Sequence, residues 1–182
     1  MATVLIPLAN GFEEIEAVTN IDVLRRAGIE VITAGVGSST IKGDHGIKME
    51  TDRNLSEISP EQIEAVLLPG GMPGAENLKK SDYLLKLIKE VYKKGDLVAA
   101  ICAAPMVLEE AGVLDGRKAT SYPGFDKEMP SCDYQDKRVV IDGNIITGRG
   151  PGMALEFAVT VVEYLVGREK AEELKDNMLA GF

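Results

Sequence analysis

The chain has 182 residues, a length that suits one domain able to bury a sizeable core. Hydrophobic residues make up 45% of the sequence and charged residues 27%, which is typical of a globular protein and not of a disordered chain. The formal net charge of −9 disfavours nucleic acid as a tight partner, because such a surface repels polyanions. No apolar stretch approaches the roughly 20 residues that a membrane helix needs, so no membrane partner is expected.

The N-terminal segment 3–8 is apolar but has no basic lead, and it includes Pro7. It is therefore interpreted as a first strand and not as a secretory signal. Without such a signal, a structural disulfide between the two cysteines, Cys102 and Cys132, is not expected. We predict a cytoplasmic protein that keeps one cysteine for its reactivity.

Strand-like and helix-like segments alternate from there on. Segment 13–27 has apolar residues at helical spacing and stops at Gly28, and segment 29–34 reads as a second strand. Segment 40–50 is predicted to be a hairpin or an irregular strand pair. The sequence SPEQ from Ser59 combines an N-cap, a first-turn proline and a capping-box glutamine, which predicts the start of a short helix.

The second half continues the alternation. Segments 65–69 and 97–101 are short and apolar, as expected of strands covered on both faces. The other predicted elements are helices at 81–94 and 103–111, short strands within 118–150 around a turn at 142–143, a buried helix at 151–166 and a charged helix at 169–179. Repeated strand–helix units predict a mainly parallel sheet sandwiched between helices, in a single domain 1–182.

Cys102 is the first candidate for chemistry, because ligands of open α/β sheets bind beyond the carboxyl ends of the strands and Cys102 directly follows segment 97–101. The small residues Ala103 and Ala104 leave room for a sharp turn of the nucleophile-elbow type. The next helix offers N–H groups and positive partial charge, which would stabilise a thiolate and lower its pKa. The alternative is a small buried hydrophobe, as most free cysteines are.

Gly70 and Gly71 follow segment 65–69 in the same way. Paired glycines allow backbone N–H groups to turn toward a neighbouring strand end and to stabilise an oxyanion. Taken alone they would be a plain tight turn, but beside a strand-end cysteine an oxyanion role is favoured.

Three acids, Glu13, Glu14 and Glu16, lie near the start of the first helix, where carboxylates suit the helix dipole. Glu16 can also face inward toward the strand ends. Burial there would raise its pKa and keep it protonated, so that it donates a hydrogen bond to a thiolate. An ionised carboxylate in the same place would oppose thiolate formation.

His45 is the only histidine and lies far from Cys102 in the sequence, so a Cys–His–acid triad is not expected and His45 is interpreted as a surface or interface residue. The sparse histidine and cysteine content predicts no metal-ligand cluster. No dinucleotide fingerprint follows the first strand, so no cofactor is expected. Cys132 is interpreted as a bystander, with a role as an oxidation partner as the weaker alternative.

Five segments together resemble the ThiJ/PfpI superfamily, in the branch that holds the parkinsonism-associated deglycase and bacterial YajL. They are EEIEA at 13–17, DVLRRAG at 22–28, LPGG at 68–71, AICAAP at 100–105 and GRGPG at 148–152. The resemblance runs in order from the first strand to the last helix. It implies a flavodoxin-like three-layer α/β/α sandwich, usually as a homodimer.

The resemblance also implies roles for single residues. Cys102 would be the reactive thiol and Glu16 its protonated partner, and Gly71 and Ala103 would match backbone positions around the oxyanion pocket. Arg26 and His45 occupy places similar to an anion-binding spot near the dimer interface. The family often has a second arginine at that spot, so His45 is a departure from its pattern. A greater departure is Tyr122, which stands where many relatives carry a histidine near the cysteine.

Three functions remain open. The first is an enzyme of the glyoxalase or deglycase type, in which Cys102 attacks a small reactive carbonyl such as methylglyoxal, or an early adduct of one, and Glu16 shuttles the proton. The second is a redox sensor or oxidation-dependent chaperone that acts through Cys102. The third, an intracellular protease or amidase, ranks last because it needs a histidine near the thiol, and Tyr122 is a poor base near neutral pH.

Overall fold

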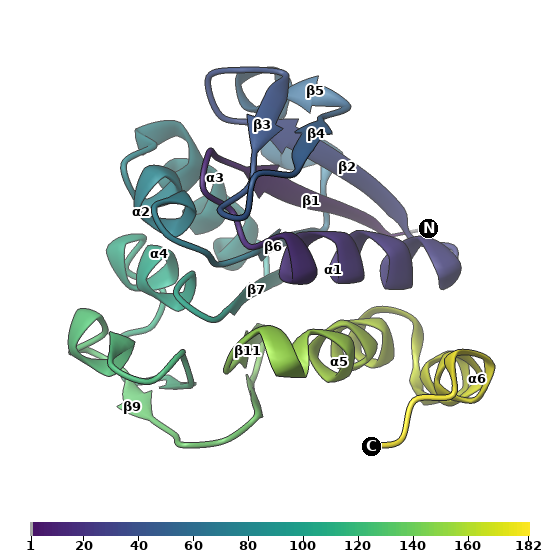
Figure 1. Ribbon diagram of the computed structural model, residues 1–182. Coiled ribbons are helices and arrows are strands. Elements are labelled where there is room, and N and C mark those ends of the chain that lie inside the picture. The colour runs from purple at the N-terminus through teal and green to yellow at the C-terminus, as the bar shows by residue number, and fades with distance from the viewer. Residues whose placement is uncertain (1) are drawn as a thin grey trace.

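Seven strands form the central sheet of the computed structural model, which describes residues 2–182 (Figure 1). Their order across the sheet is β10-β11-β7-β6-β1-β2-β5, and all neighbours are parallel except β10 and β11. The strands are β1 (Thr3–Leu8), β2 (Glu30–Gly35), β5 (Arg53–Asn54), β6 (Ala65–Leu68), β7 (Leu97–Ile101), β10 (Val139–Asp142) and β11 (Ile145–Gly148). Two strand pairs lie outside this sheet: β3 (Thr40–Lys42) with β4 (Lys48–Glu50), and β8 (Lys118–Ala119) with β9 (Asp133–Tyr134).

Helices cover both faces of the sheet (Figure 1). One face carries α1 (Glu14–Arg26), α5 (Ala154–Val166) and α6 (Arg168–Met178), and the other carries α2 (Gly74–Lys79), α3 (Asp82–Lys93) and α4 (Pro105–Glu110). Four 3₁₀ turns complete the described chain: η1 (Leu55–Glu57), η2 (Pro60–Gln62), η3 (Phe125–Glu128) and η4 (Pro151–Met153). The predicted α/β/α sandwich with a mainly parallel sheet is confirmed.

Each central strand contributes to two hydrophobic cores, one on each face of the sheet. Val66 and Leu68 of β6 pack into the core under α2, α3 and α4, while Ala65 and Leu67 pack into the core under α1, α5 and α6. Side chains alternate across a strand, so a strand buried on both faces needs apolar residues at every position. This explains why β6 and β7 could be predicted from their uninterrupted apolar sequences.

Most predicted elements are found close to their expected bounds. The strands at 3–8 and 97–101 match to the residue, the pair within 40–50 is the antiparallel hairpin β3–β4, and the SPEQ helix is the 3₁₀ turn η2, whose Ser59 N–H donates to Gln62 Oε1. The helix predicted to begin at 103 begins at Pro105, because the residues before it form the turn after β7. Helix α2 and the two-residue edge strand β5 were not predicted from the sequence.

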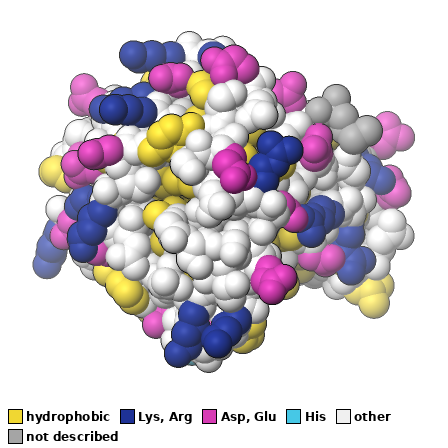
Figure 2. All heavy atoms as spheres, turned by 90° about the horizontal axis from the view of Figure 1, so that it is seen from above, with side chains coloured by type: hydrophobic (Ala, Val, Ile, Leu, Met, Phe, Trp, Pro, Cys, Tyr) yellow, Lys and Arg dark blue, Asp and Glu magenta, His cyan; other side chains and the backbone are white. Residues whose placement is uncertain are grey.

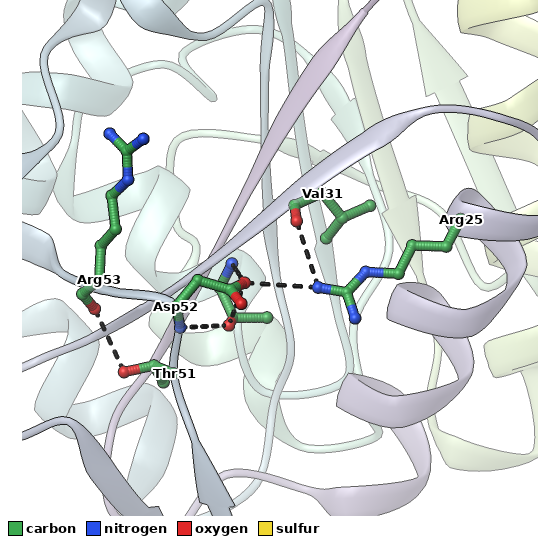
Figure 3. A network of polar contacts seen from close by, with 6 residues as sticks. Arg25, Val31, Thr51, Asp52 and Arg53 are labelled. Carbon is green, nitrogen blue, oxygen red and sulfur yellow. Dashed lines mark hydrogen bonds and ion pairs between the residues drawn. The ribbon is translucent and has the colours of Figure 1, made fainter.

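The edge strand β5 is tied to the sheet by one carboxylate (Figure 3). Asp52 Oδ2 accepts hydrogen bonds from the Thr33 N–H (2.9 Å) and hydroxyl (2.7 Å), and it pairs with Arg25 at 3.3 Å. Partial burial acts to raise the pKa of Asp52, but the bonds from Thr33 and the charge of Arg25 lower it below its ordinary value. Arg25 also donates to the Val31 carbonyl, so this network joins α1, β2 and β5.

The surface is mixed in charge. On the face shown in Figure 2, cationic and anionic side chains are interspersed, and apolar side chains form small patches between them. That face has no broad field of one sign, which fits a protein that stays dispersed through its net negative charge. No helix within residues 2–182 has the length and apolar character needed to cross a bilayer.

Candidate active site at the end of strand β7

Strands β1, β6 and β7 are neighbours in the sheet, and the segments that follow them meet at one edge. The Gly70 N–H after β6 donates to Glu16 Oε2 at 2.7 Å, and the Gly70 carbonyl accepts from the Glu13 N–H at 2.9 Å. A methyl group placed on Gly70 would lie 2.8 Å from the Cβ of Cys102. The structure therefore brings together Cys102, Glu16 and Gly70, which were predicted as site residues from separate parts of the sequence.

Cys102 has the backbone conformation of a nucleophile elbow. Its φ is 65°, in the left-handed region that residues with a side chain rarely adopt. Backbone hydrogen bonds hold this turn, since the Cys102 N–H donates to the Gly148 carbonyl and the Cys102 carbonyl accepts from the Tyr122 N–H, each at 2.9 Å. The sharp turn predicted after β7 is thus present, and neighbouring loops fix it.

The thiol lies at the wall of a cavity of about 260 Å³. Cys102 is only 9% exposed, so a reagent must enter the cavity to reach it. The cavity is lined by Glu13, Asp44, Gly71, Met72, Cys102, Ala103, Tyr122, Phe125 and Pro151. A cysteine with the environment of a plain buried hydrophobe would have no such opening beside it.

Glu16 is a fully buried carboxyl group with one satisfied oxygen. Burial raises its pKa to about 7, against the opposing effects of the Gly70 N–H and the Cys102 thiol, while the charge of Glu13 raises it further. Its second oxygen, Oε1, has no partner with hydrogen-bond geometry within the described chain. Burial of this carboxyl group therefore favours its protonated form, in the direction expected from the sequence.

The thiol itself differs from the prediction of a sulfur acidified by the next helix. Burial raises the pKa of Cys102, and an ionised Glu16 raises it further. The backbone N–H groups of Ala103 and Gly71 act in the opposite direction. Helix α4 contributes little because it spans only Pro105–Glu110 and begins three positions after the sulfur. The prediction of a lowered thiol pKa is therefore wrong, and burial is the largest cause.

Glycine is required at both positions after β6. A methyl group on Gly71 would lie 2.3 Å from the Glu13 nitrogen, and the φ of Gly71 is 89°. A methyl group on Gly70 would also lie 2.9 Å from Glu16 Oε2. The absence of side chains lets the backbone N–H groups of this segment approach both the buried carboxyl group and the sulfur.

The structure does not bring Arg26 and His45 together within one chain. Arg26 ends α1 and pairs with Asp22 at 2.7 Å on the surface. His45 contacts Glu14, the first residue of α1, through both its backbone N–H (2.8 Å) and its ring Nδ1 (3.0 Å). A helix of 13 residues separates the two ends by about 18 Å. The hydrogen bond to Glu14 raises the pKa of His45, and the carboxylates around it disfavour an anion there.

Glu13, Asp44 and His45 form a group that the sequence analysis missed. Their ligand-type atoms all lie within 4.8 Å of one another, so these residues could hold a cation, although the sparse histidine and cysteine content predicted no metal-ligand cluster. Asp44 and His45 are far from Glu13 in sequence and reach it because the β3–β4 turn folds over the start of α1. The only hint in the sequence was the acidic start of the helix.

Two residues singled out from the sequence have different surroundings. Tyr122 lines the cavity of Cys102 and is 47% exposed. Cys132 is half-buried elsewhere, and its thiol donates to the Met129 carbonyl at 3.3 Å. Burial raises the pKa of Cys132, and nearby Glu109 raises it further. Cys132 does not line the cavity, in agreement with its interpretation as a bystander.

The raised pKa of Glu16 makes a prediction about stability. An acid whose folded pKa (about 7) exceeds its unfolded value (4.5) binds more protons in the folded state, so wild-type stability falls as pH rises between these values. Glu16→Gln lacks this titration. The free energy of unfolding of wild type relative to Glu16→Gln should therefore drop by about 3 kcal/mol between pH 4.5 and 8 in urea titrations. Glu169→Gln, at an exposed position, is the control and should follow the wild-type pH dependence. If the free energies of unfolding of wild type and Glu16→Gln change in parallel with pH, the raised pKa of Glu16 is contradicted.

Comparison with known proteins places this geometry in a family. Residues 2–164 match the model of the DJ-1/PfpI family. Protein DJ-1 homolog B of Arabidopsis thaliana is 47% identical over 179 residues, covering 97% of this chain but 41% of the relative, so the chain spans less than half of that protein. A deglycase of Pyrococcus abyssi is 36% identical over 151 residues, covering 82% of this chain and 90% of the relative. The structure of oxidized Toxoplasma gondii DJ-1 superposes with a TM-score of 0.96 at 38% identity and full coverage of both chains. The chain therefore belongs to the DJ-1/PfpI family.

Proposed function

We propose that the protein is a cysteine-dependent enzyme of the glyoxalase or deglycase type, acting on small reactive carbonyls such as methylglyoxal or their early adducts. The observation that carries the proposal is the convergence of the buried Glu16 and two backbone N–H groups on Cys102, which lies at the wall of a cavity. The family membership and the relative named as a deglycase support it.

The pair Cys102 and Glu16 shares one proton near neutral pH. With Glu16 ionised, its carboxylate can accept the thiol proton as the sulfur attacks an aldehyde carbon, so that no free thiolate has to accumulate beside a charged acid. The N–H groups of Ala103 and Gly71 stabilise negative charge on the sulfur before attack. The thiol pKa, raised in the resting state, is thus compatible with a nucleophilic role.

For methylglyoxal the chemistry balances through this one acid. Sulfur adds to the aldehyde carbon, and Glu16 returns its proton to the new alkoxide oxygen. The Glu16 carboxylate then takes the remaining hydrogen of that carbon as a proton, which gives an enediolate. The hydroxyl proton passes to the neighbouring oxygen and Glu16 delivers its proton to the neighbouring carbon, so that the first carbon becomes the carbonyl of a lactoyl thioester. Water hydrolyses the thioester to lactate and restores the thiol, so that methylglyoxal and water yield lactate and one proton.

Removal of the thiol tests the proposal. Cys102→Ala should reduce lactate formation from methylglyoxal by at least about 100-fold, to the uncatalysed background, because no other thiol lines the cavity among the described residues. Cys132→Ala is the matched control and should keep wild-type turnover. Unchanged lactate production by Cys102→Ala would exclude the mechanism.

The second candidate is a redox sensor or chaperone that acts through oxidation of Cys102. The structure of oxidized Toxoplasma gondii DJ-1 supports this candidate. Glu16 Oε1 also supports it, because this oxygen is buried, unpaired and able to donate a hydrogen bond to an oxidised sulfur when protonated. The protease or amidase alternative has less support, because no histidine lines the cavity in the part of the chain that the structure describes.

Peroxide treatment tests whether Cys102 or Cys132 is the oxidation-sensitive cysteine. Equimolar hydrogen peroxide followed by mass spectrometry should place added oxygen on Cys102, because Cys102 lines a cavity and the N–H groups of Ala103 and Gly71 stabilise negative charge on its sulfur. The thiol of Cys132 is instead hydrogen-bonded to the Met129 carbonyl and lies near Glu109. Glu16→Gln can still donate a hydrogen bond and should keep this site preference. Preferential oxidation of Cys132 would defeat the sensor hypothesis.

We further infer that the chain forms the homodimer expected from the sequence, and that it remains a cytoplasmic protein. Ile15 and Val18, one helical turn apart on α1, are 56% and 47% exposed, and Ile47 next to α1 is 56% exposed. Adjacent apolar side chains of this size on a surface are typical of a protein–protein contact. A second copy would cover them.

The dimer is tested by sedimentation. Wild type should run at about twice the mass of one chain, and Val18→Asp should shift it to the monomer, because a charge would be buried unpaired in the contact. Val166→Asp is the matched control, since Val166 on α5 is 44% exposed and lies outside this patch. A monomeric wild type, or a Val18→Asp variant that stays dimeric, would contradict the assignment.

A further inference from the structure

The charged residues at the cavity of Cys102 all carry the same sign. Of its lining residues within 2–182, the charged ones are Glu13 and Asp44. The nearest candidate cation, His45, is engaged by Glu14 at 3.0 Å and lies 3.7 Å from Glu13, so its charge is offset by carboxylates when it is protonated. A molecule that approaches the sulfur therefore passes two carboxylates.

Arg149 is the one cationic residue among the described residues that line this cavity and the adjacent one. Arg149 lines an adjacent cavity that shares Tyr122 and Pro151 with the first one. Its guanidinium is ion-paired with Asp136, so it does not face the sulfur as a free charge. Glu13 and Asp44 are thus the carboxylates that line the cavity, and the buried Glu16 adds its own charge beneath the sulfur when it is ionised.

The remaining side chains of the wall are apolar or aromatic. Met72, Phe125 and Pro151 line the cavity beside the sulfur, together with the ring of Tyr122. Such a wall suits an alkyl group, and it offers a carboxylate no cationic side chain to replace its water. With a volume of about 260 Å³, the cavity suits a compound of a few carbon atoms.

We propose that Glu13 and Asp44 are specificity-determining residues that admit uncharged small carbonyl compounds and exclude those that carry a carboxylate. This inference rests on the proposed function and narrows its substrate class: neutral oxoaldehydes are accepted, and oxo acids such as glyoxylate are rejected. Two unit charges at about 6–8 Å in a water-filled mouth reduce the local concentration of an anion by about 5- to 10-fold.

The same charges act on the product. A neutral oxoaldehyde becomes a hydroxy acid anion during the proposed reaction, so the two carboxylates repel the product but not the substrate. Release of the anion is thereby favoured, and lactate is expected to be a weak inhibitor.

Alkylation of Cys102 by two reagents of similar size tests the selectivity without any turnover. Iodoacetamide is neutral and iodoacetate is anionic. In wild type, the ratio of their rate constants should exceed the ratio for free 2-mercaptoethanol by about 5- to 10-fold at low salt, and 0.5 M NaCl should reduce it. Both reagents attack the same sulfur, so a change in the pKa of the thiol cancels in the ratio.

Charge removal then assigns the effect to the two residues. Below pH 7, where Glu16 is mostly protonated, Glu13→Gln/Asp44→Asn should bring the ratio within about 2-fold of the free-thiol value. Glutamine at position 13 keeps the oxygen that accepts from the Ile15 N–H. Glu169→Gln/Glu172→Gln on α6 removes the same net charge far from the cavity and should leave the ratio unchanged. If the double variant does not fold, Asp44→Asn alone, on an exposed turn, should give about half of the logarithmic effect.

Two results would overturn the proposal: a wild-type ratio equal to that of the free thiol, or a ratio that survives removal of both charges. The outcome for the enzyme is read separately. If wild type forms no lactate from methylglyoxal but still shows a selective alkylation ratio, only the glyoxalase function is contradicted. If wild type converts methylglyoxal and glyoxylate with equal kcat/KM, only the charge selectivity is contradicted.

Discussion

The site depends on a carboxyl group that is buried where three strands end. Glu16 has no exposed surface, accepts one hydrogen bond from the Gly70 N–H and leaves Oε1 unpaired. A charge in this position loses most of its hydration, and one hydrogen bond replaces only part of it. The neutral form of Glu16 is therefore favoured up to about pH 7. The ease with which the neighbouring thiol ionises depends on whether Glu16 holds its proton.

The surrounding backbone is built to bring this acid and the sulfur together. Cys102 adopts a left-handed conformation, which costs of the order of 1 kcal/mol for a residue with a side chain. Gly70 and Gly71 have no room for a Cβ, because the carboxyl group, the sulfur-bearing residue and the α1 start already occupy the space. The buried strands β6 and β7 hold these strained positions, since apolar packing on both faces fixes where each strand ends.

Much of this could be predicted from sequence because the signals are local. Strands β1 and β7 were placed to the residue from uninterrupted apolar runs, and Cys102 was identified by its position after one of them. What failed depends on contacts between distant segments. The group formed by Glu13, Asp44 and His45 joins residues about thirty positions apart, and no local pattern records that the β3–β4 turn reaches α1. Helix α2 is short and preceded by Pro73, so periodicity could not reveal it.

The lowered pKa predicted for the Cys102 thiol was wrong because the prediction left out burial. A cysteine followed by a helix predicts acidification, but that argument assumes solvent near the sulfur and a helix long enough to act. Burial of Cys102 and the proximity of Glu16 outweigh the N–H groups of Ala103 and Gly71. Near neutral pH the pair of Glu16 and Cys102 then carries at most one negative charge. The reactivity of the sulfur depends on transfer of its proton to the Glu16 carboxylate. Glu16→Gln therefore separates the two roles of Glu16. Only the carboxylate can take a proton from the thiol, whereas the carboxylic acid and the amide can both donate a hydrogen bond to a charged sulfur.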